Sequence, residues 1–263
     1  MTEPVEWQCQ ANGVGVVTLN RPDGRNSMTP ELREGFSKVL DRVIATDELR
    51  CLVVTGKGSC FSAGADFRSI VQRDEGPGYR MPHERSYAMY TPFLKLLDVE
   101  VPVIAAMNGH AVGGGFGLSL LADIRIANED AKYGATFAKL GLHPGMGISY
   151  VLPRLVGVAR AAELLFTGRL ILGNEAASIG LVTDAVPAGE VLPRALLIAE
   201  QIAANAPLAV RSMKRGFYEG LEWHPRKAAY AEALAQAHTL ETEDAAEGVA
   251  ALLEKRPPQF RGR

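Results

Sequence analysis

The chain has 263 residues, a length that fits one large domain or a core with a small appendage. Hydrophobic residues make up 47% and charged residues 22%, as in an ordinary globular protein with a sizeable core. The net charge of −2 provides no broad basic surface, so nucleic acid is not expected as a partner. No long apolar run and no signal-peptide pattern is present, so no membrane span is predicted.

The cysteines are Cys9, Cys51 and Cys60, an odd number without a CxxC motif. This usage favours free thiols in a reducing compartment over a disulfide or a metal site. We therefore expect a cytoplasmic protein with no metal centre.

The first two thirds of the sequence predict alternating strands and helices. Thr29 and Pro30 are typical of a helix N-cap followed by proline at the first helical position. The predicted strands are 14–19, 51–55, 101–107, 123–127 and 181–185. The predicted helices of this part are 30–45, one beginning near Phe67, 84–97, 116–122 and a short one after Asn174. The segment 73–83 is rich in Gly, Pro and charge, which predicts a mobile loop.

After about residue 186 the pattern is helical only. The predicted helices there are 190–205, 208–220, 225–240 and 244–254. The sequence thus predicts an α/β core over residues 1–187 and a helical C-terminal segment over residues 188–263.

Two short loops rich in small residues follow predicted buried strands and lead into helices. They are residues 61–66 and residues 112–116. Small residues at a helix start let a ligand approach unpaired backbone N–H groups. Two such groups pointing at one carbonyl oxygen would form an oxyanion hole, while turns that only permit close packing are the structural alternative.

Nucleotide and nucleophile motifs fail at both loops. A GxGxxG motif beginning at Gly113 would need glycine where the chain has Leu118, and residues 56–59 do not supply a Walker A sequence. A GxSxG elbow fails around Ser62 and around Ser119.

The two loops resemble those of the enoyl-CoA hydratase/isomerase, or crotonase, family. Residues 61–66 (FSAGAD) resemble the first oxyanion segment of that family, and residues 108–115 (NGHAVGGG) resemble the second. The likeness continues through residues 122–127, 141–147, 152–157, 167–168 and 176–182, and reaches both ends of the chain. It covers nearly the whole chain in order.

This resemblance implies a spiral of ββα units followed by a helical segment used for trimerisation. It implies a homotrimer or a dimer of trimers that acts on a CoA thioester, with no permanently bound cofactor. The N–H groups of Ala65 and Gly114 would hold the thioester carbonyl. The residues that the resemblance assigns to the substrate or the CoA moiety are Arg25, Ser27, Ala63, Ala65, Asp66, Phe67, Gly113, Gly114, Gly117 and Phe137. Lys214, Lys255 and Phe260, of the same or of a neighbouring subunit, would lie near the CoA phosphates or adenine.

The sequence departs from the family pattern at the two catalytic glutamates. Gly117 and Phe137 stand where family hydratases carry them, and neither side chain can move a proton. A phenylalanine would make the acyl pocket more apolar and a glycine would make it roomier, which suits a long or bulky acyl chain.

Other groups are candidates for a relocated proton relay. His143 lies in the expected acyl-pocket loop and is of a residue type often used in proton transfer, but a turn histidine bonded to the backbone is the structural alternative. His110, Asp123, Ser119 and Thr136 are interpreted as structural, and His83, Glu84 and Tyr87 as exposed.

The reaction stays open among several alternatives. The chain is either a lyase or isomerase of lipid metabolism that stabilises a thioester enolate, or a non-catalytic long-chain acyl-CoA binder, or a hydratase/isomerase with a relocated acid/base. Fold alone does not distinguish them.

Overall fold

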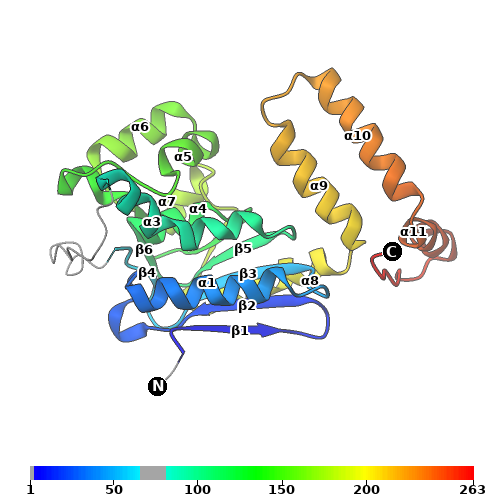
Figure 1. Ribbon diagram of the computed structural model, residues 1–263, viewed down its shortest axis with the longest axis horizontal. Helices are drawn as coiled ribbons and strands as arrows, with labels where there is room; N and C mark the ends of the chain where they lie inside the picture. Colours follow the sequence, from blue (N-terminus) through cyan, green and yellow to red (C-terminus); the bar gives the residue numbers. More distant parts are fainter. Residues whose placement is uncertain (1–2, 66–80) are drawn as a thin grey trace.

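The computed structural model of the chain describes residues 3–65 and 81–263, which form two β-sheets surrounded by helices (Figure 1). The larger sheet has the strand order β1-β2-β3-β5-β7-β10, and the smaller sheet has the order β4-β6-β8-β9. The strands of the larger sheet are β1 (Val5–Cys9), β2 (Val14–Leu19), β3 (Cys51–Gly56), β5 (Val103–Met107), β7 (Ile124–Asn128) and β10 (Asp184–Val186). Those of the smaller sheet are β4 (Cys60–Ser62), β6 (His110–Val112), β8 (Lys132–Gly134) and β9 (Ile171–Leu172).

The helices occur between the strands and, after β10, follow one another without a strand. The α-helices are α1 (Pro30–Ile44), α3 (Pro82–Leu94), α4 (Gly114–Leu120), α5 (Ile148–Val156), α6 (Val158–Thr167), α7 (Gly173–Ser178), α8 (Val191–Ala203), α9 (Pro207–Gly220), α10 (Pro225–Leu240) and α11 (Glu243–Glu254). The 3-10 helices are η1 (Pro22–Gly24), η2 (Lys95–Asp98), η3 (Thr136–Leu140) and η4 (Ala188–Glu190).

The structure confirms the predicted α/β class and the helical C-terminal part, and it differs in three details. The sequence patterns missed β1, and they missed the strands of the smaller sheet because strands of two or three residues leave no readable alternation. They also missed α5 and α6. Residues 81–83 of the predicted mobile loop include the start of α3, and residues 73–80 and the predicted helix near Phe67 lie outside the described part.

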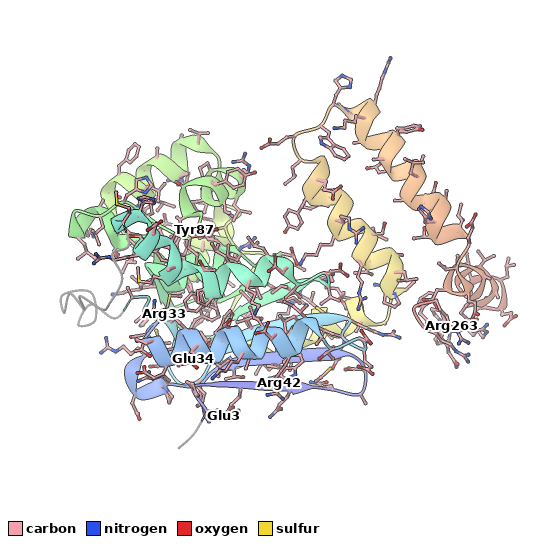
Figure 2. The ribbon with its side chains drawn as sticks, viewed as in Figure 1. Glu3, Arg33, Glu34, Arg42, Tyr87 and Arg263 are labelled. Carbon is pink, nitrogen blue, oxygen red and sulfur yellow. The ribbon has the colours of Figure 1, made fainter. Side chains whose placement is uncertain are left out.

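Helix α1 shows how local sequence sets the packing. The Thr29 hydroxyl accepts a hydrogen bond from the Leu32 N–H at 3.3 Å, which caps the helix as predicted. Its inner face is buried, with Leu32, Phe36, Val39, Leu40 and Val43 in the core. Charged residues such as Glu34 and Arg42 lie on its exposed face (Figure 2).

The larger sheet is covered on both faces, so its strands are buried along their length. Helix α8 packs on one face through Val191, Ala195 and Ala199, all fully buried against strand residues such as Val53. The neighbouring residue Leu52 points to the other face and joins the main core.

The smaller sheet brings the two predicted oxyanion loops to one edge. Strands β4, β6 and β8 run parallel, with Cys60 paired to His110 and Ala111 paired to Tyr133. The carboxyl ends of parallel strands share one edge, where ligands of α/β proteins commonly bind. The segments that leave this edge are residues 63–65 after β4, Gly113 and α4 after β6, and η3 after β8.

Helix α9 is fastened to the core through Asp123. The Lys214 Nζ lies 2.9 Å from an Asp123 carboxylate oxygen and also donates to the carbonyls of Val99 and Val101. The Tyr218 hydroxyl donates to the other Asp123 oxygen at 2.6 Å. Both charged side chains of the ion pair are largely buried, so this contact is a strong constraint on α9. It agrees with the structural interpretation of Asp123.

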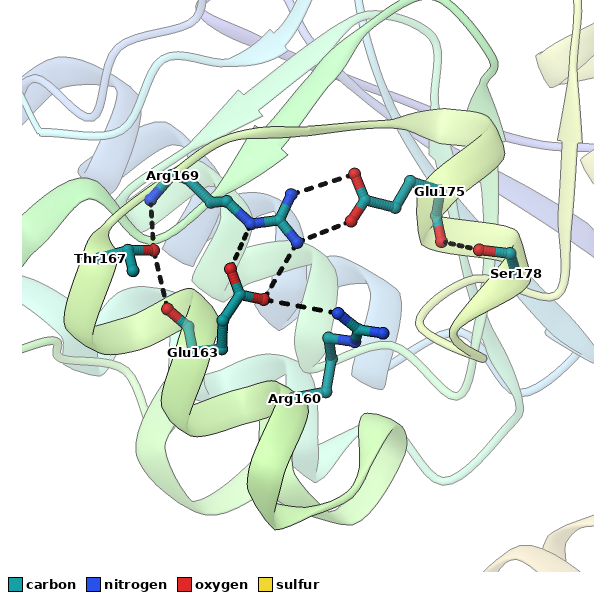
Figure 3. Close-up of polar contacts among 6 residues, drawn as sticks. All are labelled: Arg160, Glu163, Thr167, Arg169, Glu175 and Ser178. Atoms are coloured by element: carbon teal, nitrogen blue, oxygen red, sulfur yellow. Dashed lines mark hydrogen bonds and ion pairs between the residues drawn. The ribbon is translucent and has the colours of Figure 1, made fainter.

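A second ionic cluster ties α6 to α7 (Figure 3). Arg169 lies between two carboxylates, with its Nη2 3.0 Å from Glu163 and 2.7 Å from Glu175. Hydrogen bonds from this guanidinium lower the pKa of both glutamates. The backbone beside it packs closely on β8, since a β-carbon on Gly134 would lie 2.8 Å from the Arg169 carbonyl oxygen. The cluster therefore supports the strand that precedes η3.

The C-terminal helices stand away from the two sheets. Figure 1 shows α9, α10 and α11 at the end of the molecule opposite the loops of residues 61–65. They carry many exposed apolar side chains: Met213, Phe217, Leu221, Tyr230, Leu234, Leu240, Leu252 and Leu253. Among the described residues, none of the helices combines the length and apolarity needed to cross a membrane.

Candidate oxyanion site

The first oxyanion segment (residues 61–65) is tied to an earlier loop by backbone hydrogen bonds. The Ala63 N–H donates to the Arg25 carbonyl at 3.0 Å, and the Met28 N–H donates to the Gly64 carbonyl at 2.8 Å. These bonds fasten the segment to residues 25–28.

Asn26 completes this connection from a fully buried position. Its side-chain amide donates to the Cys60 carbonyl at 2.7 Å, and its own carbonyl accepts from the Ser62 hydroxyl at 2.8 Å. Arg25 and Asn26 both have positive φ angles, 52° and 51°, which asparagine tolerates better than most residues. The strained turn and the buried asparagine thus fix where β4 ends.

The two oxyanion segments meet at Gly64. This residue has a φ of +81°, and a β-carbon added to it would lie 2.5 Å from the Val112 carbonyl oxygen and 2.8 Å from the Gly114 nitrogen. A β-carbon on Gly115 would lie 2.1 Å from the Ser62 carbonyl oxygen. Side chains are therefore excluded sterically from both segments, and the backbones approach each other directly.

The backbone N–H groups of Ala65 and Gly114 have no acceptor among the described residues. Their neighbours do, since the Gly113 N–H donates to the Gly134 carbonyl at 2.9 Å and the Gly117 N–H donates to Gly113 at 3.0 Å. Gly114 is the first residue of α4, where an N–H cannot bond within the helix. Two N–H groups without an acceptor in the described part of the chain, on touching segments, match what an oxyanion hole requires.

Phe137 lies beside this pair of segments. Its ring carbon Cζ is the nearest atom to a β-carbon placed on Gly113, at 3.9 Å, and its side chain is buried. The ring reaches this point because η3 follows directly from β8, the neighbour of β6. The surface it offers is apolar and carries no proton.

Gly117 does not provide room, which corrects the sequence-based expectation. A β-carbon at this position would lie 3.2 Å from the Met146 Cβ and 3.2 Å from the Ile148 Cδ1. Both residues are buried, with exposures of 4% and 0%. The volume next to Gly117 is filled by the loop that precedes α5, so the prediction of a roomier pocket was wrong.

The histidines near the site are bonded to the backbone. His143 is exposed, and its Nδ1 lies 2.7 Å from the Pro144 carbonyl oxygen. This is the turn arrangement named as the structural alternative for His143. His110 accepts a hydrogen bond from the Lys132 N–H at 2.9 Å through its Nδ1, in agreement with the structural interpretation.

The remaining candidates for a proton relay are also in structural positions. The buried Ser119 hydroxyl donates to the Phe116 carbonyl at 2.7 Å, which is a bond within α4. His83, Glu84 and Tyr87 are exposed on α3, as expected (Figure 2 shows Tyr87).

The residues assigned to the CoA path are only partly placed. The Arg25 side chain is exposed and forms no ion pair with another described residue. The Ser27 hydroxyl donates to the Gly24 carbonyl at 2.6 Å. Asp66 and Phe67 lie outside the described residues. Lys214 is occupied by Asp123, so the expectation that it lies near CoA phosphates does not fit its contacts in this chain.

Three residues at the site were missed by the sequence analysis. The Met28 sulfur would lie 2.8 Å from a β-carbon on Gly114, so it packs directly on the second segment. The half-buried Tyr90 of α3 packs on Gly145, and burial raises the pKa of its phenol. Met146, which lines Gly117, is the third. A lone methionine or tyrosine in a helix or turn gives no sequence signal for such contacts.

No set of His, Cys, Asp or Glu side chains that could hold a metal ion occurs among the described residues. The three thiols, Cys9, Cys51 and Cys60, are free.

Comparison with known proteins agrees with this geometry. The profile of the family described as enoyl-CoA hydratase/isomerase matches residues 9–263. Enoyl-CoA hydratase EchA19 of Mycobacterium tuberculosis is 36% identical, over 94% of this chain and 93% of that protein. The (E)-benzylidenesuccinyl-CoA hydratase of Thauera aromatica is 35% identical, over 96% of this chain and 97% of that protein.

The crystal structure of an enoyl-CoA hydratase from Bacillus anthracis matches with a TM-score of 0.92 and 35% identity, covering 99% of this chain and 100% of that one. The match extends over both sheets and the C-terminal helices. The chain therefore belongs to the enoyl-CoA hydratase/isomerase family.

Proposed function

We propose that this protein binds an acyl-CoA thioester and holds its carbonyl oxygen with the N–H groups of Ala65 and Gly114. The observation that carries the proposal is the direct contact of two backbone segments at Gly64, each with an N–H group that has no acceptor among the described residues. In a catalytic oxyanion hole, the loss of one donor costs about 3–4 kcal/mol of transition-state stabilisation. Two such donors stabilise an enolate more than the neutral thioester.

The ligand class follows from the relatives. EchA19 is named as an enoyl-CoA hydratase, and the Thauera aromatica protein is named for an aryl-substituted acyl-CoA. The exposed Arg25 side chain, which forms no ion pair with a described residue, supports the proposal, because its guanidinium is suited to a CoA phosphate. Ser27, Ala63, Asp66, Phe67 and Gly113 complete the proposed substrate and CoA path.

The proposed chemistry is not simple hydration by paired glutamates. Each missing general acid or base is worth about 10²–10⁴ in rate, so Gly117 and Phe137 remove most of what a family hydratase uses to add water. Isomerisation, thioester hydrolysis and C–C bond cleavage each pass through an oxyanion that the hole would stabilise. His143 stays a candidate base only if its loop moves, because its ring is exposed and bonded to Pro144.

A non-catalytic acyl-CoA binder is the second candidate. The observation in its favour is that the closest neighbours of Gly117 are Met146 and Ile148, and that Phe137 takes the other glutamate position. A wall of this composition binds an apolar acyl group without moving a proton. The names of the relatives favour an enzyme, including a hydratase/isomerase with a relocated acid/base.

We also propose a homotrimer or a dimer of trimers, located in the cytoplasm. The exposed apolar side chains of α10 and α11, among them Tyr230, Leu240 and Leu252, are more than a monomer usually leaves in solvent. A closed symmetric oligomer would cover them. The free thiols of Cys9, Cys51 and Cys60 suit a reducing compartment.

Isotope-edited infrared spectroscopy tests the oxyanion hole. A saturated acyl-CoA with a ¹³C-labelled thioester carbonyl is added to the protein, and the carbonyl stretch is compared with that of the free ligand. Two N–H donors polarise the carbonyl, so the stretch moves to lower frequency on binding. A bound thioester whose carbonyl frequency equals that in solvent would reject the assignment of Ala65 and Gly114.

A further inference from the structure

Met146 has an unusual conformation for a buried residue. Its φ is +57°, a left-handed angle that side chains other than those of glycine and asparagine rarely adopt, and only 4% of its surface is exposed. Gly147 follows with a φ of +71°, and the Ile148 N–H closes the turn on the Gly145 carbonyl at 3.2 Å. Such strain persists where the surrounding structure enforces it, and it is found often at functional sites.

One side of Met146 faces the oxyanion site. Its Cβ fills the position next to Gly117, three residues after Gly114 in α4. Gly114 and Gly117 are three residues apart and therefore lie on the same side of α4. Met146 packs on Gly117, so it lies on the side of α4 that carries the proposed donor Gly114. Tyr90 supports the turn from behind by packing on Gly145.

The other side of Met146 opens on a groove of about 890 Å³. We call this the α9 groove, because it lies between α9 and the core, where η2, the end of α4, and α5 form its floor. Its apolar lining consists of Leu94, Leu96, Leu97, Val99, Leu120, Leu121, Ala122, Met146, Val151, Leu155, Phe217 and Leu221.

Some of the charged residues of the α9 groove are held by other protein groups, whereas Asp98 and Glu219 are exposed to solvent. Lys214 is bound to Asp123 at 2.9 Å, and Arg154 is bound to Glu222 at 2.8 Å. The apolar side chains that line the groove form its main binding surface. A cavity of this size with an apolar lining and few free polar groups suits an uncharged hydrophobic ligand.

We propose that Met146 is the residue that limits acyl-chain length, and that the α9 groove would receive the distal part of a long acyl chain once Met146 is displaced. The inference rests on the proposed acyl-CoA site, since only that site supplies a ligand that begins beside Gly114. Methionine suits this position because its flexible side chain can fill a gap or swing away from it. In the native protein Met146 closes the passage, so short acyl groups are preferred over long ones.

Calorimetric titration with butyryl-, octanoyl- and dodecanoyl-CoA tests the proposal. Met146→Ala is expected to raise the affinity for dodecanoyl-CoA relative to butyryl-CoA at least tenfold over the native protein. Met146→Gly should do the same with a backbone that fits the left-handed angle, which keeps the test valid if the alanine variant folds poorly. Met213→Ala, which removes an exposed methionine outside the groove, should leave the ratio unchanged.

A second substitution locates the acyl tail. Leu97 is 60% exposed and lines the α9 groove, so Leu97→Arg adds a charge there at little cost to the fold. In the double variant Met146→Ala/Leu97→Arg, the gain for dodecanoyl-CoA should disappear. A gain that survives Leu97→Arg would overturn the assignment of the groove. A change of oligomeric mass caused by Leu97→Arg would instead show that a second copy covers it, and would also overturn the proposal.

The failure of this proposal is distinguishable from failure of the acyl-CoA site itself. Tight binding of butyryl-CoA with an unchanged chain-length ratio in both Met146 variants would reject the role of Met146 alone. If native protein and variants bind none of the three thioesters, the proposed function falls, and this inference falls with it.

Discussion

Gly64 and Gly114 approach each other so closely that a β-carbon on Gly64 would lie 2.8 Å from the Gly114 nitrogen. This contact between residues 50 positions apart in the sequence brings the segment that follows β4 against the start of α4. It also places Ala65 next to the first turn of α4. The proposed oxyanion hole depends on this one backbone contact.

Gly64→Ala should therefore disrupt the site. The new methyl group would collide with the Val112 carbonyl and the Gly114 amide, and alanine is strained at a φ of +81°. We expect acyl-CoA affinity to fall at least tenfold, measured by calorimetry. Gly157→Ala is the matched control, because its φ is +77° and no atom lies within 4 Å of its β-carbon. If both variants bind equally well, the contact does not organise the site.

Gly117→Ala should destabilise the protein despite the usual preference of helices for alanine. That preference is worth about 0.5–1 kcal/mol, whereas overpacking a buried site typically costs about 1–3 kcal/mol. The neighbours Met146 and Ile148 are buried on the same wall, so neither can move freely. Urea unfolding should show a net loss of about 1 kcal/mol.

Gly216→Ala on α9 is the control for this substitution. Gly216 is exposed in a helix, and nothing lies within 4 Å of its β-carbon, so alanine should stabilise it. Stabilisation by both substitutions would mean that the wall beside Gly117 yields easily. That outcome would support the expectation from the sequence that the pocket beside Gly117 has room.

Replacing Asp123 should loosen α9. Asp123→Ala removes the partner of Lys214 and leaves a largely buried cation, which typically costs about 3–5 kcal/mol. Tyr218→Phe removes only one hydrogen bond to the same carboxylate and should cost about 1–2 kcal/mol. Thermal unfolding should show that Asp123→Ala lowers the stability of the protein more than Tyr218→Phe does. Equal and small losses would show that the cluster does not hold α9 against the core.

The buried thiols should make the protein sensitive to alkaline pH. Burial raises the pKa of Cys60 from its ordinary value of 9.0 to about 11, and that of Cys51 to about 12. A raised pKa favours the neutral thiol, so the stability it contributes is complete below pH 9 and is lost as the pH rises through the folded-state pKa. For Cys60 this window is pH 9 to about 11.

Urea unfolding between pH 8 and pH 11 measures this effect. Cys60→Ala should remove part of the loss of stability at alkaline pH, whereas replacement of the exposed Cys9, whose pKa is also raised but less, should have a smaller effect. Iodoacetamide at pH 8 should label Cys9 first, because the other two thiols are buried and protonated. Rapid labelling of Cys60 in the native protein would contradict its placement.

The sequence predicted features that depend on local signals. The cap at Thr29 with Pro30 gives the observed start of α1, and the predicted end at residue 45 is one residue past the observed one. Strand β2 has the bounds that its apolar run predicted. The small residues around Gly64 and Gly114 indicated close backbone contact because glycine is favoured where a side chain cannot fit. Resemblance to the family then supplied the chemistry of that contact.

Features that depend on contacts between residues far apart in the sequence could not be predicted from it. The glycine at position 117 suggested additional space in the pocket. Met146 and Ile148, which lie just before and at the start of α5, fill that space. The helix α5 begins after two left-handed residues, Met146 and Gly147, which hide its start from any periodic pattern. His143 lies in the expected loop, but its exposure follows from a turn that the sequence does not specify.

The most direct test of the account is mass spectrometry of 2-enoyl-CoA and saturated acyl-CoA substrates incubated with the protein in deuterated water. We predict deuterium exchange at the α-carbon without addition of water, because the oxyanion hole is present and Gly117 and Phe137 replace the paired glutamates. Loss of this exchange in His143→Ala would then identify His143 as the base. Efficient hydration of the enoyl-CoA substrates would contradict the account, since it would show that this site adds water without either glutamate.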